Sequence, residues 1–327
     1  MTNTTDQYIT HTWDKVFPKS DKVTHTKVTF PNRFGITLVA DLYLPKDAGD
    51  EPLPALAVSG PFGAVKEQSS GLYAQQMAEK GYLAIAFDPS YTGESSGTPR
   101  YMASPDINTE DFQAAVDFLT NNHLVDKERI GIIGIFGWGG LSLNAAAIDT
   151  RVKATVATTM YNMSRVNAKG YYDAEDSPEQ RLEKKKQLNA QRTQDFASQD
   201  PELAGGVVDP LPDDAPQFVK DYYAYYKQPR GYHPRSLNSN RGWSITMPLS
   251  FINTPLLHYI DELESAVLLI HGDAAHSFYF SEDTYKQLKG DNKAFHVIPN
   301  ASHVDLYDRL DIIPFDMIDD FFQKYLK

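Results

Sequence analysis

The sequence contains no cysteine among its 327 residues. This excludes disulfide bonds, thiolate nucleophiles and metal sites with cysteine ligands. No apolar run approaches the roughly 18 residues that a membrane-spanning helix needs. Residues 1–15 have no basic segment followed by an apolar one, so we expect no signal peptide and a cytoplasmic protein.

Positive charge is scarce, because 31 lysines and arginines stand against 43 aspartates and glutamates, which gives a formal net charge of -12. This surplus of acidic residues argues against nucleic acid or an anionic membrane surface as a partner. Hydrophobic residues make up 41% and charged residues 23%, as in ordinary globular proteins. We expect one large domain that binds a small molecule, and the sequence leaves homo-oligomerisation open.

Motifs that hold nucleotides or metals are missing from the sequence. No GxGxxG segment follows the first strand pattern, and neither a Walker loop nor an HExxH pair occurs. The nine histidines are scattered and do not show the spacing of metal ligands. We therefore expect no metal and no cofactor.

Strand and helix patterns alternate along most of the chain. Residues 23–44 alternate apolar and polar positions around an Asn-Arg-Phe-Gly turn, which predicts an antiparallel hairpin at a sheet edge. Helical patterns cover 71–80 and 106–122. Short apolar runs typical of buried strands occur at 53–58, 82–87, 130–135, 153–158, 266–270 and 294–298. This alternation predicts an α/β fold with a doubly wound, mostly parallel sheet.

One long segment, residues 161–259, interrupts the alternation. It begins with a charged helical stretch at 177–194 and continues through the loop-like stretch 204–216. We predict a core formed by 1–160 and 260–327, with 161–259 as a helical cap. The cap tyrosines either pack within the lid or line a pocket, and they are Tyr222, Tyr223, Tyr225 and Tyr226.

Residues 130–141, IGIIGIFGWGGL, read as a buried strand that turns sharply into a helix. In hydrolases of this kind, small residues flank the apex of the turn, and the apex side chain is the nucleophile. Here the apex is Phe136, which has neither a proton to lose nor a lone pair with which to attack. The N–H of the next residue, Gly137, is expected to face the oxygen of a bound carbonyl group.

His303 follows the last predicted strand, where the general base of such an architecture belongs. The acid is expected after the preceding strand, and Asp273 is the first candidate, with Glu282 behind it. His276, on the same loop, could instead be a second polar group at the site.

The second oxyanion donor is expected in the loop 59–68, from the amide of Phe62 or Gly63. Lys66 and Glu67 are expected to order this loop as an ion pair or as a helix start. The segment 88–97 reads as a structural loop below the pocket.

Several longer stretches carry a resemblance to a known family. The chain resembles the dienelactone-hydrolase-like branch of the α/β-hydrolase superfamily, specifically bacterial proteins of the YcjY-like type. The resemblance implies an α/β-hydrolase fold with ester or lactone hydrolysis as the activity. It rests on GPFGAVKEQSSGLYAQQMAEKGY, AFDPSYTGESSGTPR, SPDINTEDFQAAVDFL, ERIGIIGIFGWGGLSLNAAAIDTRVKA, YYKQPRGYHPRSLNSN, HGDAAHSFYFSEDTY and NASHVDLYDRLDIIPFD.

The chain departs from the family pattern at three positions. The apex residue of the family looks to be cysteine, in a Gly-Ile-Cys-Gly-Trp-Gly-Gly type run, so Phe136 replaces the nucleophile. By the same resemblance, Phe278 stands where arginine is usual and Asn162 where aspartate is usual. We expect these two residues to line the pocket, together with Trp138 and His276.

Three hypotheses follow for the function. The chain is a hydrolase silenced by a natural or introduced replacement at Phe136, or it is a pseudoenzyme that binds a small apolar or ester-like ligand. In the second case Phe62, Phe136 and Phe278 would form an aromatic floor. In the third, His303 abstracts a proton from a bound substrate directly.

Overall fold

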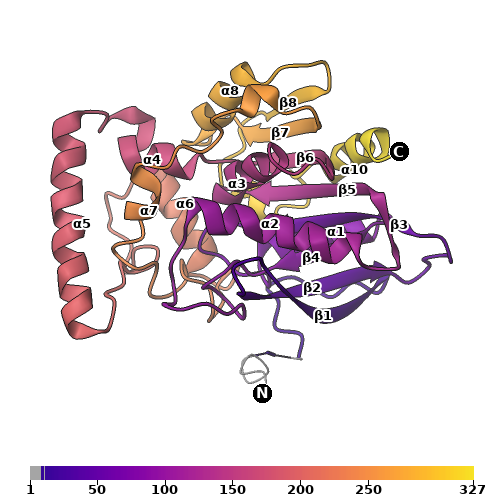
Figure 1. The fold of residues 1–327 in the computed structure, drawn as a ribbon, viewed down its shortest axis with the longest axis horizontal. Coiled ribbons are helices and arrows are strands. Elements are labelled where there is room, and N and C mark those ends of the chain that lie inside the picture. Colours follow the sequence, from indigo (N-terminus) through magenta and orange to yellow (C-terminus); the bar gives the residue numbers. More distant parts are fainter. Residues whose placement is uncertain (1–8, 11) are drawn as a thin grey trace.

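The computed structural model describes residues 9–10 and 12–327. Residues 1–8 and 11 lie outside the described residues. They make up most of residues 1–15, for which the sequence predicts no signal peptide. Eight strands form one sheet in the order β1-β2-β4-β3-β5-β6-β7-β8 (Figure 1). The strands are β1 Val23–Pro31, β2 Thr37–Pro45, β3 Leu53–Ser59, β4 Leu83–Phe87, β5 Val125–Ile135, β6 Val152–Thr158, β7 Ala266–Gly272 and β8 Lys293–Ile298.

The sheet is mostly parallel. Strand β2 pairs antiparallel with both β1 and β4, and every other neighbouring pair is parallel. The predicted hairpin is present, with β1 at the edge and β2 one place inside it. Strands β4 and β7 are buried along their whole length, which explains their uninterrupted apolar sequences. The α/β fold with a doubly wound sheet is confirmed.

Helices cover both faces of the sheet. Side chains from α2 (Pro105–Thr120) and α3 (Gly137–Ala146) belong to one hydrophobic cluster. Those from α1 (Ser69–Ala78) and α10 (Phe315–Tyr325) belong to a second cluster on the opposite face. Because β3, β4 and β5 contribute alternate residues to the two clusters, each of these strands is apolar on both sides.

The segment between β6 and β7 supplies no strand to the sheet. It contains α4 Met163–Lys169, α5 Pro178–Ser198, α6 Gln217–Tyr226 and α7 Leu249–Ile252. Helix α5 stands at one side of the molecule, away from the sheet (Figure 1). It begins after Ser177, whose side chain accepts a hydrogen bond from the N–H of Gln180, and it extends four residues past the predicted end.

Two of the four cap tyrosines, Tyr225 and Tyr226, are buried. Tyr222 and Tyr223 are partly buried, and Tyr222 lies against the ring of Phe136, as described below. Tyr225 and Tyr226 therefore pack inside the fold, and whether Tyr222 lines a pocket stays a prediction. Among the described residues, none of the helices combines the length and the apolar character that crossing a membrane requires.

Candidate active site

Strand β5 delivers Phe136 onto a sharp turn into α3, as the sequence predicts. The residue has φ 60° and ψ -126°, a positive-φ conformation that costs a side-chain-bearing residue on the order of 1–3 kcal/mol. Backbone hydrogen bonds hold it there. Its N–H donates to Thr158 O at 3.0 Å, and its carbonyl accepts from the N–H groups of Gly139 and Tyr161, each at 2.9 Å.

The turn needs glycine because α3 passes close to β5. A Cβ at Gly134 would lie 2.1 Å from the carbonyl oxygen of Trp138, and one at Gly140 would lie 2.3 Å from that of Tyr161. The side chain of Trp138 points away from the apex and packs edge-on against Phe87 and Phe112 in the core. The expectation that Trp138 lines the pocket is therefore wrong.

Aromatic rings surround the partly exposed side chain of Phe136. Its ring centroid lies 4.4 Å from that of Tyr161, 4.9 Å from that of His303 and 6.4 Å from that of Phe62, each time edge to face. Trp243 of the cap segment stacks on Phe62 at 4.5 Å. Core and cap thus meet over the apex through aromatic side chains.

His303 lies behind Phe136 and is only 2% exposed. Its Nδ1 lies 2.7 Å from Thr159 Oγ1 and 2.7 Å from Ser277 Oγ, while its Nε2 lies 2.9 Å from Tyr307 Oη. Both ring nitrogens therefore have hydroxyl partners. Within the described part of the chain, no carboxylate forms a hydrogen bond or ion pair with this ring.

A second buried histidine extends the chain of hydroxyl contacts. His271 Nε2 lies 2.9 Å from Ser277 Oγ, and its Nδ1 lies 2.7 Å from Ser281 Oγ. Burial lowers the pKa of His271 to about 3 and that of His303 well below its ordinary value. Both imidazoles are neutral at physiological pH.

His276 lies beside His303, as expected for a further polar group at the site. Its Nε2 forms a hydrogen bond with the hydroxyl of Tyr161, and its ring centroid lies 5.3 Å from that of His303. Burial lowers the pKa of His276 to about 4.

The two candidates for the acid lie outside the cluster. Asp273 is exposed, and its Oδ1 accepts a hydrogen bond from the N–H of Asn300 at 2.6 Å, which caps a turn. Glu282 is also exposed and forms an ion pair with Lys286 at 3.3 Å. The expectation of Asp273 or Glu282 as the partner of His303 is wrong, because the loop after β7 presents Ser277 at that place.

Two further expected pocket residues point elsewhere. Phe278, at the start of α8 (Phe278–Gln287), stacks on Phe295 at 5.6 Å and lies 5.9 Å from His271. It is not part of an aromatic floor with Phe136. The Asn162 side chain accepts a hydrogen bond from the N–H of Arg165 at 3.0 Å and so caps α4. Phe278 thus faces Phe295 and His271, whereas for Asn162 the structure shows a capping role and its place at the pocket stays a prediction.

The loop after β3 brings the expected oxyanion donors beside the apex. A Cβ on Gly137 would lie 2.9 Å from Phe62 Cβ, so the two residues are neighbours. Asn238 of the cap segment donates to Phe62 O at 2.8 Å through Nδ2 and to Gly63 O at 3.0 Å through its N–H. Among the described residues, no group accepts a hydrogen bond from the N–H of Phe62 or Gly137. Two backbone donors are thus free for a ligand oxygen.

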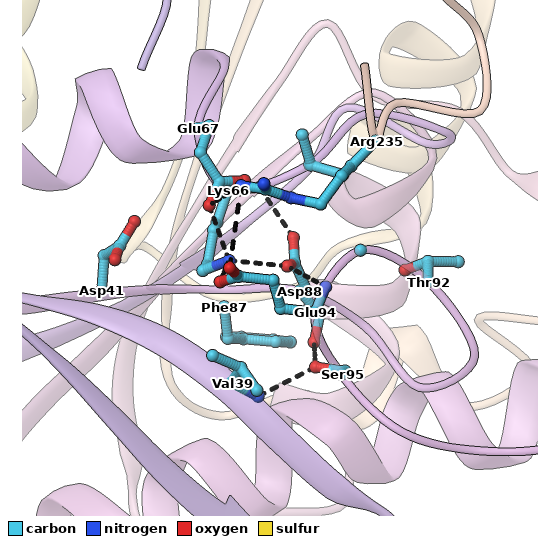
Figure 2. Close-up of polar contacts among 12 residues, drawn as sticks. Val39, Asp41, Lys66, Glu67, Phe87, Asp88, Thr92, Glu94, Ser95 and Arg235 are labelled. Carbon is cyan, nitrogen blue, oxygen red and sulfur yellow. Dashed lines mark hydrogen bonds and ion pairs between the residues drawn. The ribbon is translucent and has the colours of Figure 1, made fainter. Parts of the chain in front are cut away.

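A buried ammonium group fixes this loop, as Figure 2 shows. Lys66 Nζ lies 2.7 Å from Glu67 Oε1, 2.8 Å from Asp88 Oδ2 and 2.6 Å from Glu94 Oε2, and all four side chains are buried. Burial alone would lower the pKa of Lys66, but the surrounding carboxylates hold it well above its ordinary value. The expected ion pair is present, within a larger network.

The three carboxylates of this network have oxygens within 4.8 Å of one another, a spacing that suits a metal ion. The ammonium of Lys66 is bonded to each of them and so fills the position that a cation would take.

The cap joins the network through Arg235. Its guanidinium group lies beside Glu67 (Figure 2), with Nη2 2.8 Å from Glu67 Oε1. The same Nη2 lies 2.7 Å from Asp14 Oδ2. Sequence reasoning missed this residue because it is remote in sequence from the loop. It also missed Ser277 and Tyr307, although Tyr307 follows His303 at the i+4 spacing of one helical turn.

Comparison with known proteins identifies the family of this chain. Residues 35–305 match the X-Pro dipeptidyl-peptidase (S15 family). The chain belongs to this family. Protein PA2218 of Pseudomonas aeruginosa is 57% identical to this S15-family chain, over 97% of the chain and 85% of the relative. The crystal structure of PA2218 gives a TM-score of 0.94, covering 97% of this chain and 98% of that one.

More distant relatives of this S15-family chain include YcjY of Escherichia coli, 34% identical over 87% of this chain and 93% of YcjY. The predicted resemblance to YcjY is confirmed. The α/β hydrolase GrgF of a Penicillium species has a TM-score of 0.75 at 18% identity, covering 93% of this chain and 99% of GrgF. The latter likeness shows the α/β-hydrolase fold alone.

Replacing Lys66 by methionine should lower the free energy of unfolding by about 3–5 kcal/mol, because Asp88 loses its charged partner and Glu67 and Glu94 each lose one of theirs in a buried environment. Urea denaturation followed by circular dichroism measures the change. Lys286→Met is the matched control, since Lys286 pairs on the surface and its loss should cost at most about 1 kcal/mol. Equal losses in both variants would contradict the role given to the buried ammonium.

The neutral His271 predicts a pH dependence of stability. Its pKa is about 3 in the folded chain against an ordinary value of 6.5, so below pH 6.5 the unfolded state gains a proton that the folded state does not. The stabilisation is fully present above pH 6.5. At pH 4, protonation of this group in the unfolded chain alone should have lowered the free energy of unfolding by about 3 kcal/mol. Urea denaturation across this range should show a shallower decline for His271→Gln. The exposed His258 is the control, and if its replacement flattens the profile equally, the interpretation fails.

Proposed function

We propose that this chain is a silenced ester or lactone hydrolase of its family, whose remaining site binds a small apolar, ester-like ligand. One observation carries the proposal. Phe136 occupies the apex of an otherwise intact nucleophile turn and lies against His303, both ring nitrogens of which are bonded to hydroxyl groups.

Acyl-enzyme chemistry needs a nucleophilic atom at the apex and a base that reaches it. The benzyl group of Phe136 offers no such atom. Tyr307 engages the Nε2 of His303, so this nitrogen must release the Tyr307 hydroxyl before it can take a proton at the apex. At Nδ1, neutral hydroxyl groups stand where a carboxylate would stabilise the imidazolium ion.

These contacts also disfavour direct general-base catalysis by His303. A base works best when its pKa lies near the operating pH. Burial keeps the pKa of His303 well below its ordinary value, and the neighbouring imidazoles of His276 and His271 lower it further.

The surroundings of the apex suit a ligand that joins a carbonyl group to an apolar body. The N–H groups of Phe62 and Gly137 can donate to the carbonyl oxygen. The rings of Phe136, Tyr222 and Trp243, which are partly exposed, offer aromatic faces to the remainder. The resemblance to dienelactone-hydrolase-like proteins supports esters or lactones as the ligand class.

Hydrolysis of p-nitrophenyl acetate tests the silencing. We expect no release of p-nitrophenolate by the parent above the level of His303→Ala. Phe136→Cys should give a burst near one equivalent, because the thiol loses its proton to His303 and attacks the carbonyl carbon while p-nitrophenolate leaves. Later turnover should be slow, since removing the carboxylate of a triad costs about 10⁴-fold in rate.

Phe136→Ser and the double variant Phe136→Cys with His303→Ala are the controls. The serine variant should give a smaller burst because its hydroxyl depends more on a base, and the double variant should give none. If the parent hydrolyses the ester and this activity disappears in His303→Ala, the proposal that the site is silenced is wrong. A cysteine variant that never acylates would show that the turn does not present its apex residue to a substrate.

Binding of acetophenone, a ketone that matches an aryl ester in shape but cannot be hydrolysed, tests the second half of the proposal. We expect saturable quenching of tryptophan fluorescence, lost in Trp243→Phe and weakened at least fivefold in Phe136→Asp, which places a charge among the rings. Trp13→Phe, on the N-terminal segment, should leave the quenching in place. If the quenching does not saturate, or if Phe136→Asp leaves it unchanged, the proposal of a ligand site at the apex is wrong.

A further inference from the structure

A pocket of 330 Å³ lies between the core and the cap segment, away from the apex of the turn. Its lining comes from within residues 93–101, in the loop after β4, and from within residues 234–242 of the cap. None of the lining residues is among the aromatic residues that surround Phe136. The volume falls in the range of roughly 300–1,000 Å³ that is typical of small-molecule sites.

The charge of this lining is opposite to that of the chain as a whole. Among the described residues, three arginines line the pocket, Arg100, Arg235 and Arg241, and no aspartate or glutamate does. The whole chain, in contrast, has a formal net charge of -12. A concave surface lined by charge of one sign concentrates ligands of the other sign. The pocket therefore favours an anion.

Arg235 contributes little of this positive charge. Its guanidinium group is paired with Asp14 and Glu67, at 2.7 and 2.8 Å. These carboxylates neutralise it, and its main effect is to hold the cap segment against the core. An anion in the pocket has to be bound by the other two arginines.

The guanidinium group of Arg100 lies at the pocket wall. It donates through Nη2 to Gly93 O at 2.8 Å and through Nη1 to Ser95 O, and Gly93 itself lines the pocket. Both acceptors are uncharged carbonyl groups. These two bonds therefore set the direction of the guanidinium group without neutralising it.

Arg241 is exposed, and within the described residues its side chain forms no hydrogen bond or ion pair. It also borders a neighbouring cleft, and it forms no ion pair with the acidic residues there, Asp195, Asp200 and Glu202. A guanidinium group has five N–H donors in a planar fork. All of these donors of Arg241 are available to a ligand.

A phosphate group is the anion that fits two arginines best. Guanidinium groups donate pairs of parallel hydrogen bonds to phosphate oxygens. A phosphate monoester carries nearly two negative charges at neutral pH, which matches two arginines, whereas a carboxylate carries one. Tyr101 and Pro234, which also line the pocket, offer apolar surface to an organic group attached to the phosphate.

We propose that this pocket binds the phosphate group of a small phosphorylated compound. Arg100 and Arg241 donate hydrogen bonds to the phosphate oxygens, and the organic part of the ligand packs against the ring of Tyr101. The proposal does not depend on the fate of ester chemistry at Phe136, because the pocket lies apart from that residue.

The test uses the full-length chain with phenyl phosphate and inorganic phosphate. Broadening of the ³¹P resonance is measured against protein concentration at constant ionic strength, because salt screens exposed charges. We expect saturable binding of both, tighter for phenyl phosphate because its ring packs against Tyr101. Benzoate keeps the ring but carries a single charge, so it should compete at least fivefold more weakly.

Variants at the two arginines assign the binding to the pocket. Arg241→Gln should weaken binding of phenyl phosphate at least fivefold without lowering the melting temperature, because this side chain is exposed and bonded to no described residue. Arg241→Lys keeps the charge but loses the planar fork, so it should bind with intermediate affinity. Arg100→Gln should also weaken binding at least fivefold.

Arg192→Gln is the matched control. Arg192 is likewise exposed and without an ion pair among the described residues, but it lies on α5 and does not line the pocket. This variant changes the net charge equally and should bind like the parent. If phenyl phosphate does not bind saturably, or if Arg241→Gln binds it as Arg192→Gln does, the proposal is wrong. Binding of inorganic phosphate alone would also contradict it.

Discussion

The ammonium group of Lys66 is the contact on which the arrangement of the site depends. It joins Glu67 of its own loop to Asp88, which directly follows β4, and to Glu94 farther along the chain, all in a buried environment. Removing any member would leave uncompensated charge in the interior. The loop that carries Phe62 is neither helix nor strand, so it is held by this network together with the hydrogen bonds that Asn238 donates to Phe62 O and Gly63 O.

This chain keeps the backbone of a nucleophile turn but has Phe136 at its apex, and within the described residues no carboxylate is bonded to His303. The turn at Phe136 keeps its positive φ and its backbone hydrogen bonds, and the neighbouring amides remain free. Around His303, in contrast, hydroxyl groups and a second imidazole replace the expected carboxylate. A strained backbone conformation persists only where its surroundings impose it. Here close packing between β5 and α3 supplies that constraint without any requirement for a reactive side chain.

Local patterns allowed much of this structure to be predicted. Apolar runs marked the strands, glycine spacing marked the apex, and the position of His303 after the last strand placed it behind that apex. The directions of individual side chains were harder to predict from the sequence. Trp138 turns into the core and Phe278 turns toward Phe295, because the start of each helix sets the direction of its first side chains. Of the Lys66 network only the pair with Glu67 could be expected from the sequence, since Asp88, Glu94 and Arg235 come from distant segments that only the folded sheet brings together.

The ion pairs of Arg235 have a consequence for movement of the cap segment. This one guanidinium group bonds Asp14 near the N-terminus and the buried Glu67, while its own backbone belongs to the cap segment. Swinging the cap away as a hinged lid would break both pairs at once and leave Glu67 short of a counter-charge in a dry interior. Cap and core are therefore joined on this side by charge as well as by packing, so any motion that parts them has an electrostatic cost.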